Sequence, residues 1–218
     1  MTNKGKNQLI RGCGLIILFV IWTGLLQVVD VRVAGETSTE IGFATMNVWF
    51  HGLTGVHMWI YTLTDWMGLV PVFVCFIFGV IGFIQFIMRK NLLKVDVDII
   101  LLGIYYVIVI LGYLLFEMIP LNYRPILIEG HIEASYPSST TLLVLSVMPT
   151  LIFQCGRRLK QEMIRKMITW MTMLFSIFMV VGRLIAGVHW ISDIVGAVLL
   201  SWGMFCFYQG IVLVIDKK

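Results

Sequence analysis

The stretch GRLIAGVHWISD, residues 182–193, places an arginine, a histidine and an aspartate at fixed intervals in an otherwise apolar chain. His189 and Asp193 are four residues apart, so they can meet on one face if a helix begins near Trp190. A carboxylate that accepts one ring N–H raises the basicity of the other ring nitrogen, which would make His189 a nucleophile or a base. The alternative is that Asp193 only caps the helix while His189 lies among lipid headgroups.

Two arginines accompany this pair. Arg183 belongs to the same stretch, and Arg124 lies in LNYRPILIEG. Guanidinium groups match the oxygens of a phosphate in a forked geometry, so the two residues could hold an anionic ligand. Each could instead be an interfacial arginine whose charge only reaches the membrane surface.

A second polar stretch, SYPSSTT at residues 135–141, precedes an apolar run. Pro137 followed by Ser138, Ser139 and Thr140 predicts a turn that leads into a helix N-terminus. The free N–H groups and the dipole at such an end attract anions. An ordinary helix cap would satisfy the same pattern equally well.

The elements that must position these residues are membrane helices. The chain has 218 residues, of which 59% are hydrophobic and only 13% are charged, and its mean hydropathy is +0.94. Soluble domains carry about 25% charged residues. Six segments are long enough to cross a hydrocarbon core of about 30 Å: about 9–29, 68–88, 98–118, 139–156, 167–187 and 191–214. The sequence therefore predicts an all-α membrane protein, a six-transmembrane-helix bundle that forms one domain over residues 1–218.

The basic residues fall in alternate connections between these segments. All but three lie on one side: Lys4, Lys6, Arg11, Arg89, Lys90, Lys94, Arg157, Arg158, Lys160, Arg165, Lys166, Lys217 and Lys218. The exceptions are Arg32, Arg124 and Arg183. The positive-inside rule then predicts that both termini are cytoplasmic and that His189 and both candidate arginines face outward. The net charge of +4 is not gathered on one face, so nucleic acid is not an expected partner.

The outer segment between the first two spans, about 31–67, is rich in aromatic residues in its second half. Trp49, Trp59 and Trp66 are typical of the membrane interface, where a ring is buried and its polar edge stays wet. We expect an interfacial helix there. A sharper alternative is a lid that guides a lipid substrate sideways from the outer leaflet.

These stretches, in this order, resemble the type 2 phosphatidic-acid phosphatase superfamily of membrane lipid phosphatases. The family pattern is K-x6-RP, then PSGH, then SR-x5-H-x3-D. The third motif is matched by Arg183, His189 and Asp193, with Gly182 in place of the serine. The resemblance covers the part from about 98 to 214 and includes the six-span layout.

The first two motifs are degenerate. The first keeps Arg124 and Pro125, but Glu117 replaces the lysine. The second keeps Pro137 and Ser138, but Ser139 replaces the glycine and Thr140 replaces the histidine.

The resemblance implies a role for each matching residue. His189 would attack phosphorus to form a phosphohistidine, and Asp193 would orient its ring. The phosphate oxygens would be held by Arg124, Arg183, Ser138 and Ser139. Thr140 occupies the catalytic position of the histidine that protonates the leaving alcohol, a proton that threonine cannot supply at neutral pH. The family mechanism requires no metal ion or other cofactor.

The missing general acid affects which class of substrate is expected. A leaving phosphate needs a proton much less than a leaving alcohol does, which favours a lipid diphosphate over a phosphomonoester. His131 or Glu133 could act as a substitute acid. Glu117 would repel a phosphate if it points inward, or it could pair with Arg124.

We therefore expect an integral lipid phosphatase of the cell membrane, with an active site on the extracytoplasmic side. Its substrate would be a membrane lipid phosphate or diphosphate, such as a polyprenyl diphosphate or a phosphatidic-acid-type lipid. A phosphotransferase is a close variant. The rival from another class is a non-catalytic protein that binds or transports a lipid phosphate, which the lost lysine and histidine favour and the retained histidine–aspartate pair disfavours.

Overall fold

A computed structural model of the chain describes residues 3–215, so Lys217 and Lys218 lie outside the described residues. The long helices are α1 (Asn3–Leu26), α4 (Leu69–Arg89), α5 (Val97–Met118), α6 (Ser139–Arg158), α7 (Glu162–Ile185) and α8 (Ile191–Ile215). Within the described residues, six helical stretches have the length and apolar composition to cross a membrane. A spanning segment has to satisfy all its backbone polar groups internally, which a helix achieves. The prediction of a six-helix, multi-pass membrane bundle is confirmed.

The second span differs most from its predicted bounds. A further helix, α3 (Met58–Met67), joins α4 through Gly68, whose dihedral angles of −58° and −16° remain helical. The apolar stretch therefore runs from Met58 to Arg89, whereas the sequence predicted a start near residue 68. The first ten residues of this run, expected in the outer segment, extend the bundle instead.

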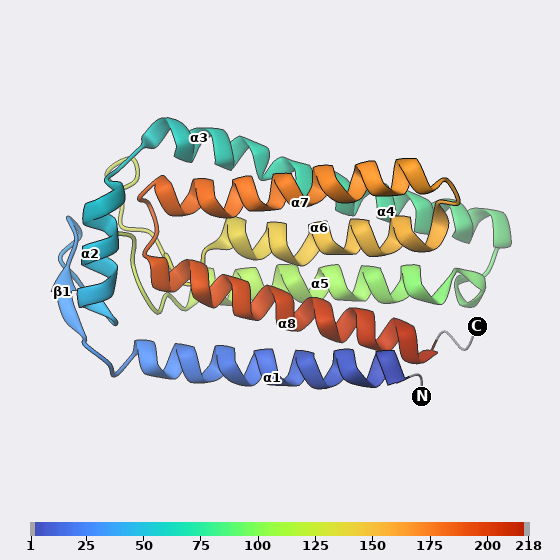
Figure 1. Ribbon diagram of the computed structural model, residues 1–218, viewed down its shortest axis with the longest axis horizontal. Coiled ribbons are helices and arrows are strands. Elements are labelled where there is room, and N and C mark those ends of the chain that lie inside the picture. The colour runs from blue at the N-terminus through green and yellow to red at the C-terminus, as the bar shows by residue number, and fades with distance from the viewer. Residues whose placement is uncertain (1–2, 216–218) are drawn as a thin grey trace.

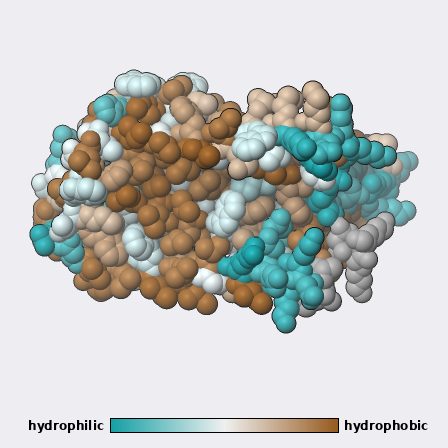
Figure 2. Space-filling model, viewed as in Figure 1, coloured by the Kyte–Doolittle hydropathy of each residue, from teal (hydrophilic) through white to brown (hydrophobic). Residues whose placement is uncertain are grey.

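The helices lie side by side with their long axes nearly parallel, and α6 occupies the middle of the bundle (Figure 1). Half of the most apolar part of α6 is buried, compared with 17% for α1 at the edge. Hydrophobic side chains cover the middle of the visible face, and hydrophilic ones gather toward the end where α1 begins and α8 ends (Figure 2). We call that end the basic end and the opposite one the site end.

The site end is closed by the segment between α1 and α3. A short antiparallel hairpin joins β1 (Arg32–Ala34) to β2 (Thr39–Ile41), with Arg32 opposite Ile41. Helix α2 (Ala44–Thr54) follows and lies across the ends of the other helices (Figure 1). The all-α prediction did not include the hairpin.

Helix α2 is tied to the start of α8 by one buried side chain. The Asn47 amide donates to the Ser192 hydroxyl at 3.0 Å, and the Ser192 backbone N–H donates to the Asn47 side-chain oxygen at 3.2 Å. An end of α8 that would otherwise leave orphan N–H groups is thus capped from another helix. The outer segment is therefore a structural support for the loops of the site end.

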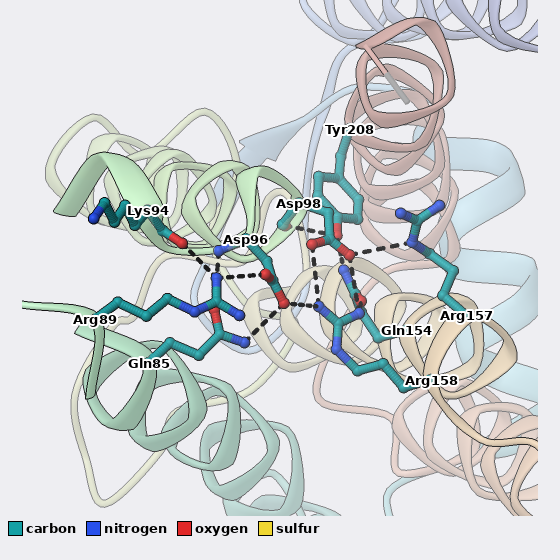
Figure 3. A network of polar contacts seen from close by, with 9 residues as sticks. All are labelled: Gln85, Arg89, Lys94, Asp96, Asp98, Gln154, Arg157, Arg158 and Tyr208. Atoms are coloured by element: carbon teal, nitrogen blue, oxygen red, sulfur yellow. Dashed lines mark hydrogen bonds and ion pairs between the residues drawn. The ribbon is translucent and has the colours of Figure 1, made fainter. Parts of the chain in front are cut away.

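At the basic end, a polar network joins α4, α5, α6 and α8 (Figure 3). The Arg158 guanidinium donates to both oxygens of Asp98 at 2.9 and 3.1 Å, and Arg157 Nε donates to the same carboxylate at 3.1 Å. Gln154 links Arg158 to the Tyr208 hydroxyl. A neighbouring carboxylate, Asp96, accepts from Gln85 and Arg89, just beyond the 3-10 turn η1 (Leu92–Lys94).

We expect Asp98→Ala to lower the thermal stability of the detergent-solubilised protein. The substitution removes the carboxylate shared by Arg157 and Arg158, which are only 27% and 28% exposed. Losing one partner of such a pair costs on the order of 2 kcal/mol, less than for a fully buried pair. The matched control is Glu162→Gln, which breaks the exposed 2.7 Å pair with Lys166. An unchanged melting temperature for Asp98→Ala would show that the network does not hold the helix ends together.

Candidate active site

The turn that carries His189 connects α7 to α8 and depends on a glycine. Gly187 has a φ of +69°, and a Cβ there would lie 2.0 Å from the Gly55 carbonyl oxygen. Only glycine accommodates both the left-handed conformation and this close approach. The turn is also held from the linker before α3, because the His57 backbone N–H donates to the Ala186 carbonyl at 3.0 Å. His189 is thus fixed by a tight turn that the outer segment supports.

Arg183 lies in the last turn of α7 and is 1% exposed. The residue before it, Gly182, allows α3 to pack closely, since a Cβ at Gly182 would lie 2.7 Å from Thr64 Cγ2. The serine that the family pattern has at this position would collide with Thr64. The departure from the pattern therefore follows from the packing of α3 against α7.

His189 and Asp193 are both buried, with exposed fractions of 3% and 0%. The structure brings them together, but His189 Nδ1 lies 3.9 Å from Asp193 Oδ2, which is too long for a hydrogen bond. The Ser135 hydroxyl lies between them, 3.0 Å from Nδ1 and 2.5 Å from Oδ2. The expected direct contact is therefore replaced by a contact through Ser135.

Asp193 has a second contact in the same place. Its Oδ2 accepts a hydrogen bond from the Trp190 backbone N–H at 2.9 Å, at the start of α8. The two interpretations of Asp193, a helix cap and a partner in the histidine site, are not exclusive.

The other ring nitrogen of His189 faces Arg183. Arg183 Nη2 lies 3.4 Å from His189 Nε2. The Tyr61 ring of α3 packs against both candidate arginines, with its centroid 4.8 Å from Arg183 Cζ and 5.7 Å from Arg124 Cζ. We call Arg124, Arg183 and Tyr61 the arginine cradle.

Arg124 belongs to the loop after α5, and hydrogen bonds of its backbone fix its position. Its N–H donates to the Glu133 carbonyl at 3.1 Å, and its carbonyl accepts from the Thr37 hydroxyl at 3.0 Å. The Glu36 backbone N–H donates to the Pro125 carbonyl at 2.8 Å. The hairpin of the outer segment thus fixes the position of Arg124.

Two carboxylates face the cradle from its exposed side. Glu133 Oε2 lies 3.1 Å from Arg124 Nε, and Asp65 Oδ1 lies 3.6 Å from Arg183 Nη1. Arg124 thus pairs with Glu133, which lies in the same loop, and not with Glu117 as proposed from the sequence. Glu117 is exposed on α5. A phosphate entering the cradle would meet arginines that already have partial counter-charges.

Several buried donor atoms of the cradle have no hydrogen-bond partner among the described residues. They are Arg124 Nε and Nη1 and Arg183 Nε and Nη1. The contacts with Glu133 and Asp65 are ion pairs without hydrogen-bond geometry. Leaving a buried donor unpaired costs about 1–3 kcal/mol, and more for a charged group. An oxyanion with several oxygens would satisfy these donors together.

At the N-terminus of α6, the predicted phosphate-binding residue Ser138 makes two hydrogen bonds within the protein. Ser138 is fully buried, its hydroxyl donates to Thr141 Oγ1 at 3.1 Å, and its backbone N–H donates to the Asp193 carbonyl at 3.2 Å. Both of its donor groups therefore already have partners within the protein. Ser139 and Thr140 line a cleft on the side of the bundle, and their predicted roles remain predictions.

This cleft has a volume of about 440 Å³ and lies between α4, α5 and α6. Its polar lining includes Asp65, and the Asp65 carboxylate also contacts Arg183, so this part of the cleft adjoins the cradle. Most of the remaining lining is apolar and includes Val72, Ile110 and Leu143. A volume of this size falls in the range of small-molecule sites.

Some of these residues were not identified from the sequence as residues of the site, although Tyr61 belongs to the aromatic residues of the outer segment. Tyr61 and Asp65 are four residues apart on α3, and this helical spacing was the available signal that they share a face. Ser135 lies in the stretch already singled out, but its role depends on a contact with α8. His131, a candidate acid, is exposed at a tight turn in which its N–H donates to the Ile128 carbonyl at 2.8 Å.

Burial holds the pKa of His189 well below its usual 6.5, and the nearby charges of Arg124 and Arg183 lower it further. The imidazole is therefore neutral at neutral pH, with a free lone pair on one nitrogen.

We expect a nuclear magnetic resonance titration of the His189 ring to have its midpoint well below pH 6.5. Arg124→Gln should move the midpoint upward, because it removes a positive charge. A wild-type midpoint at or above 6.5 would contradict this electrostatic environment.

The comparisons with known proteins agree with this architecture. The family model of the PAP2 superfamily matches residues 35–213. The fold is similar to the crystal structure of the first transmembrane PAP2 type phosphatidylglycerolphosphate phosphatase from Bacillus subtilis, with a TM-score of 0.67 and 16% sequence identity. That similarity covers 95% of this chain and 98% of the other. No curated protein matches the chain significantly. Because the family model spans most of the sequence, the chain belongs to the PAP2 superfamily.

Proposed function

We propose that this protein is a lipid phosphatase that works through a phosphohistidine at His189. The observation that carries the proposal is that a buried, neutral imidazole faces a guanidinium across 3.4 Å, beside arginine donors that lack partners. Mere binding of a phosphate needs the arginines but not an oriented imidazole. The PAP2 fold supports the same chemistry.

In the proposed reaction, His189 Nε2 attacks the terminal phosphorus and forms a P–N bond. The bond between that phosphorus and the oxygen of the lipid leaving group breaks, and the leaving oxygen keeps the electron pair. Water then attacks the phosphohistidine, the P–N bond breaks, and inorganic phosphate is released. Arg124 and Arg183 stabilise the negative charge on the phosphoryl oxygens during both steps.

We propose a lipid diphosphate, such as a polyprenyl diphosphate, as the preferred substrate. Thr140 lines the cleft next to the cradle and cannot protonate a leaving alkoxide. A leaving lipid monophosphate is a much weaker base and needs that proton far less. A phosphatidic-acid-type lipid remains a substrate of the same chemistry, at a lower rate.

The apolar cleft is the proposed site of the lipid chain. We expect Ile110→Trp, at a half-exposed position of the lining, to raise the KM for long-chain substrates several-fold and to leave the KM for a short water-soluble diphosphate unchanged. The matched control is Ile104→Trp, which lines a separate groove between α5 and α8. Equal effects of the two variants on long-chain substrates would argue against this cleft.

We further propose that the site end faces the extracytoplasmic side of the cell membrane. Supporting this orientation, the residues of the basic end include Arg89, Lys90 and Lys94, whereas three arginines lie toward the site end. An excess of lysine and arginine, as at the basic end, is typical of cytoplasmic loops. Both termini would then be cytoplasmic.

The function is tested with purified protein in detergent and a panel of lipid phosphates and diphosphates. Release of inorganic phosphate, fastest from the diphosphates, is the expected result. The rival function, non-catalytic binding or transport of a lipid phosphate, is favoured by the replacement of the lysine and histidine by Glu117 and Thr140. Saturable binding of the same lipids without any release would support that rival. Transfer of the phosphoryl group to an added alcohol instead of water would identify a phosphotransferase.

A further inference from the structure

Ser135 lies at the centre of the buried site, and the mechanism above gives it no part. Its side chain is enclosed, with 2% of the residue exposed. The loop holds it in place, because its backbone N–H donates to the Asn122 carbonyl at 2.9 Å and the adjacent residue Ala134 bridges to Tyr123. Its hydroxyl therefore has a fixed position between His189 and Asp193.

The Ser135 hydroxyl donates its proton to Asp193. With Asp193 ionised, the 2.5 Å contact with Oδ2 needs the serine proton between the two oxygens, since two lone pairs at that distance would repel each other. A serine has only one such proton. The 3.0 Å contact with His189 must then run from the ring Nδ1–H to the serine oxygen.

The contact at the other ring nitrogen, Nε2, indicates the same tautomer. Arg183 Nη2 carries only hydrogens, and it lies 3.4 Å from His189 Nε2. A proton on Nε2 would point at a donor, whereas a lone pair there faces it favourably. The two contacts are independent, and both place the proton on Nδ1 and the lone pair on Nε2.

We propose that Ser135 is the positioning residue that selects the reactive tautomer of His189 and links the ring to Asp193. Asp193 cannot do this alone, because its carboxylate is 3.9 Å from Nδ1. The chain of hydrogen bonds runs from His189 Nδ1–H to Ser135 Oγ and from Ser135 Oγ–H to Asp193 Oδ2. The catalytic consequence, a lone pair aimed at a phosphate in the cradle, depends on the proposed phosphatase function.

The tautomer can be measured without any turnover. Protein labelled with ¹⁵N-histidine has only four imidazoles, and His189→Gln identifies the signals of residue 189. In the wild type we expect a protonated, pyrrole-type nitrogen at Nδ1 and an unprotonated, pyridine-type nitrogen at Nε2. Ser135→Ala should give a mixture of the two tautomers, and Ser135→Thr, which keeps the hydroxyl, should restore the wild-type pattern.

Activity gives a second readout. Ser135→Ala should lower kcat by roughly 10–100-fold, with little change in KM; a loss of this size is typical when a metal-ligating histidine loses the hydrogen-bond partner of its other ring nitrogen. Ser135→Thr should recover most of kcat. We expect both variants to keep the fold, because Asp193 keeps its contact with the Trp190 backbone N–H. Thermal melting of each variant checks this expectation.

The outcomes separate this inference from the proposed function. A wild-type His189 protonated on Nε2, or a tautomer unaffected by Ser135→Ala, would overturn the role of Ser135. A tautomer equally disturbed in Ser135→Thr and Ser135→Ala would do the same. If the tautomer depends on the hydroxyl but no lipid phosphate is hydrolysed, the positioning role stands and the phosphatase proposal fails.

Discussion

Replacing His189 with alanine is expected to abolish phosphate release, with a loss of roughly 10⁴- to 10⁶-fold, as for other enzymes that lose their nucleophile. The substitution removes the atom proposed to form the P–N bond. The arginines remain, so we expect lipid binding to persist within a few-fold of the wild type. Phosphate release and equilibrium binding, measured on the same preparation, check the two halves of this expectation.

The control for this experiment is His131→Ala. His131 is exposed at the tight turn after Ile128, and we expect its removal to leave turnover and its pH profile unchanged. A large loss in His131→Ala would identify it as the acid that Thr140 does not supply. Substantial release by His189→Ala would exclude His189 as the nucleophile.

Arg183→Lys is expected to lower kcat/KM by roughly 10²–10³-fold, the usual effect of losing a donor to a developing oxyanion. The guanidinium of Arg183 reaches His189 Nε2, Asp65 and the Tyr61 ring at the same time. A lysine keeps the charge but cannot reproduce this planar, forked geometry. The substitution therefore tests geometry separately from charge.

Arg124→Lys should have an effect of the same order, because the Arg124 guanidinium also packs against the Tyr61 ring, 5.7 Å from its centroid. The matched control is Arg32→Lys. Arg32 is another arginine near the site end, but it is 68% exposed and pairs with Asp30 at 2.9 Å. Wild-type kinetics in Arg183→Lys, or a comparable loss in Arg32→Lys, would show that the cradle does not hold the phosphate.

The membrane architecture was predictable because hydropathy and charge are local properties of the sequence. Runs of about 20 apolar residues identify spanning helices regardless of their neighbours, so six spans were predicted and six such stretches are found among residues 3–215. The start of the second span was missed by about one helix, α3 (Met58–Met67). Its aromatic residues fit the membrane interface equally well, and its packing depends on space at Gly182 that only the folded chain reveals.

The candidate site was predictable only in part, for the same reason. The spacing of Arg183, His189 and Asp193 brought these residues to attention, and the structure places them together. The link through Ser135 joins residues 54 and 58 positions apart, and no periodicity in the sequence encodes such a contact. The pairing of Arg124 with Glu133 instead of Glu117 likewise follows from the path of a loop.

The central claim, covalent catalysis at residue 189, is tested most directly by trapping the intermediate. The protein is mixed with a lipid diphosphate carrying ³²P in its terminal phosphate, quenched in base within a single turnover, and cleaved into peptides. We predict label on the peptide that contains His189, bound through Nε2, and its disappearance as phosphate is released. Phosphate release in a single turnover without label on residue 189 would contradict the account.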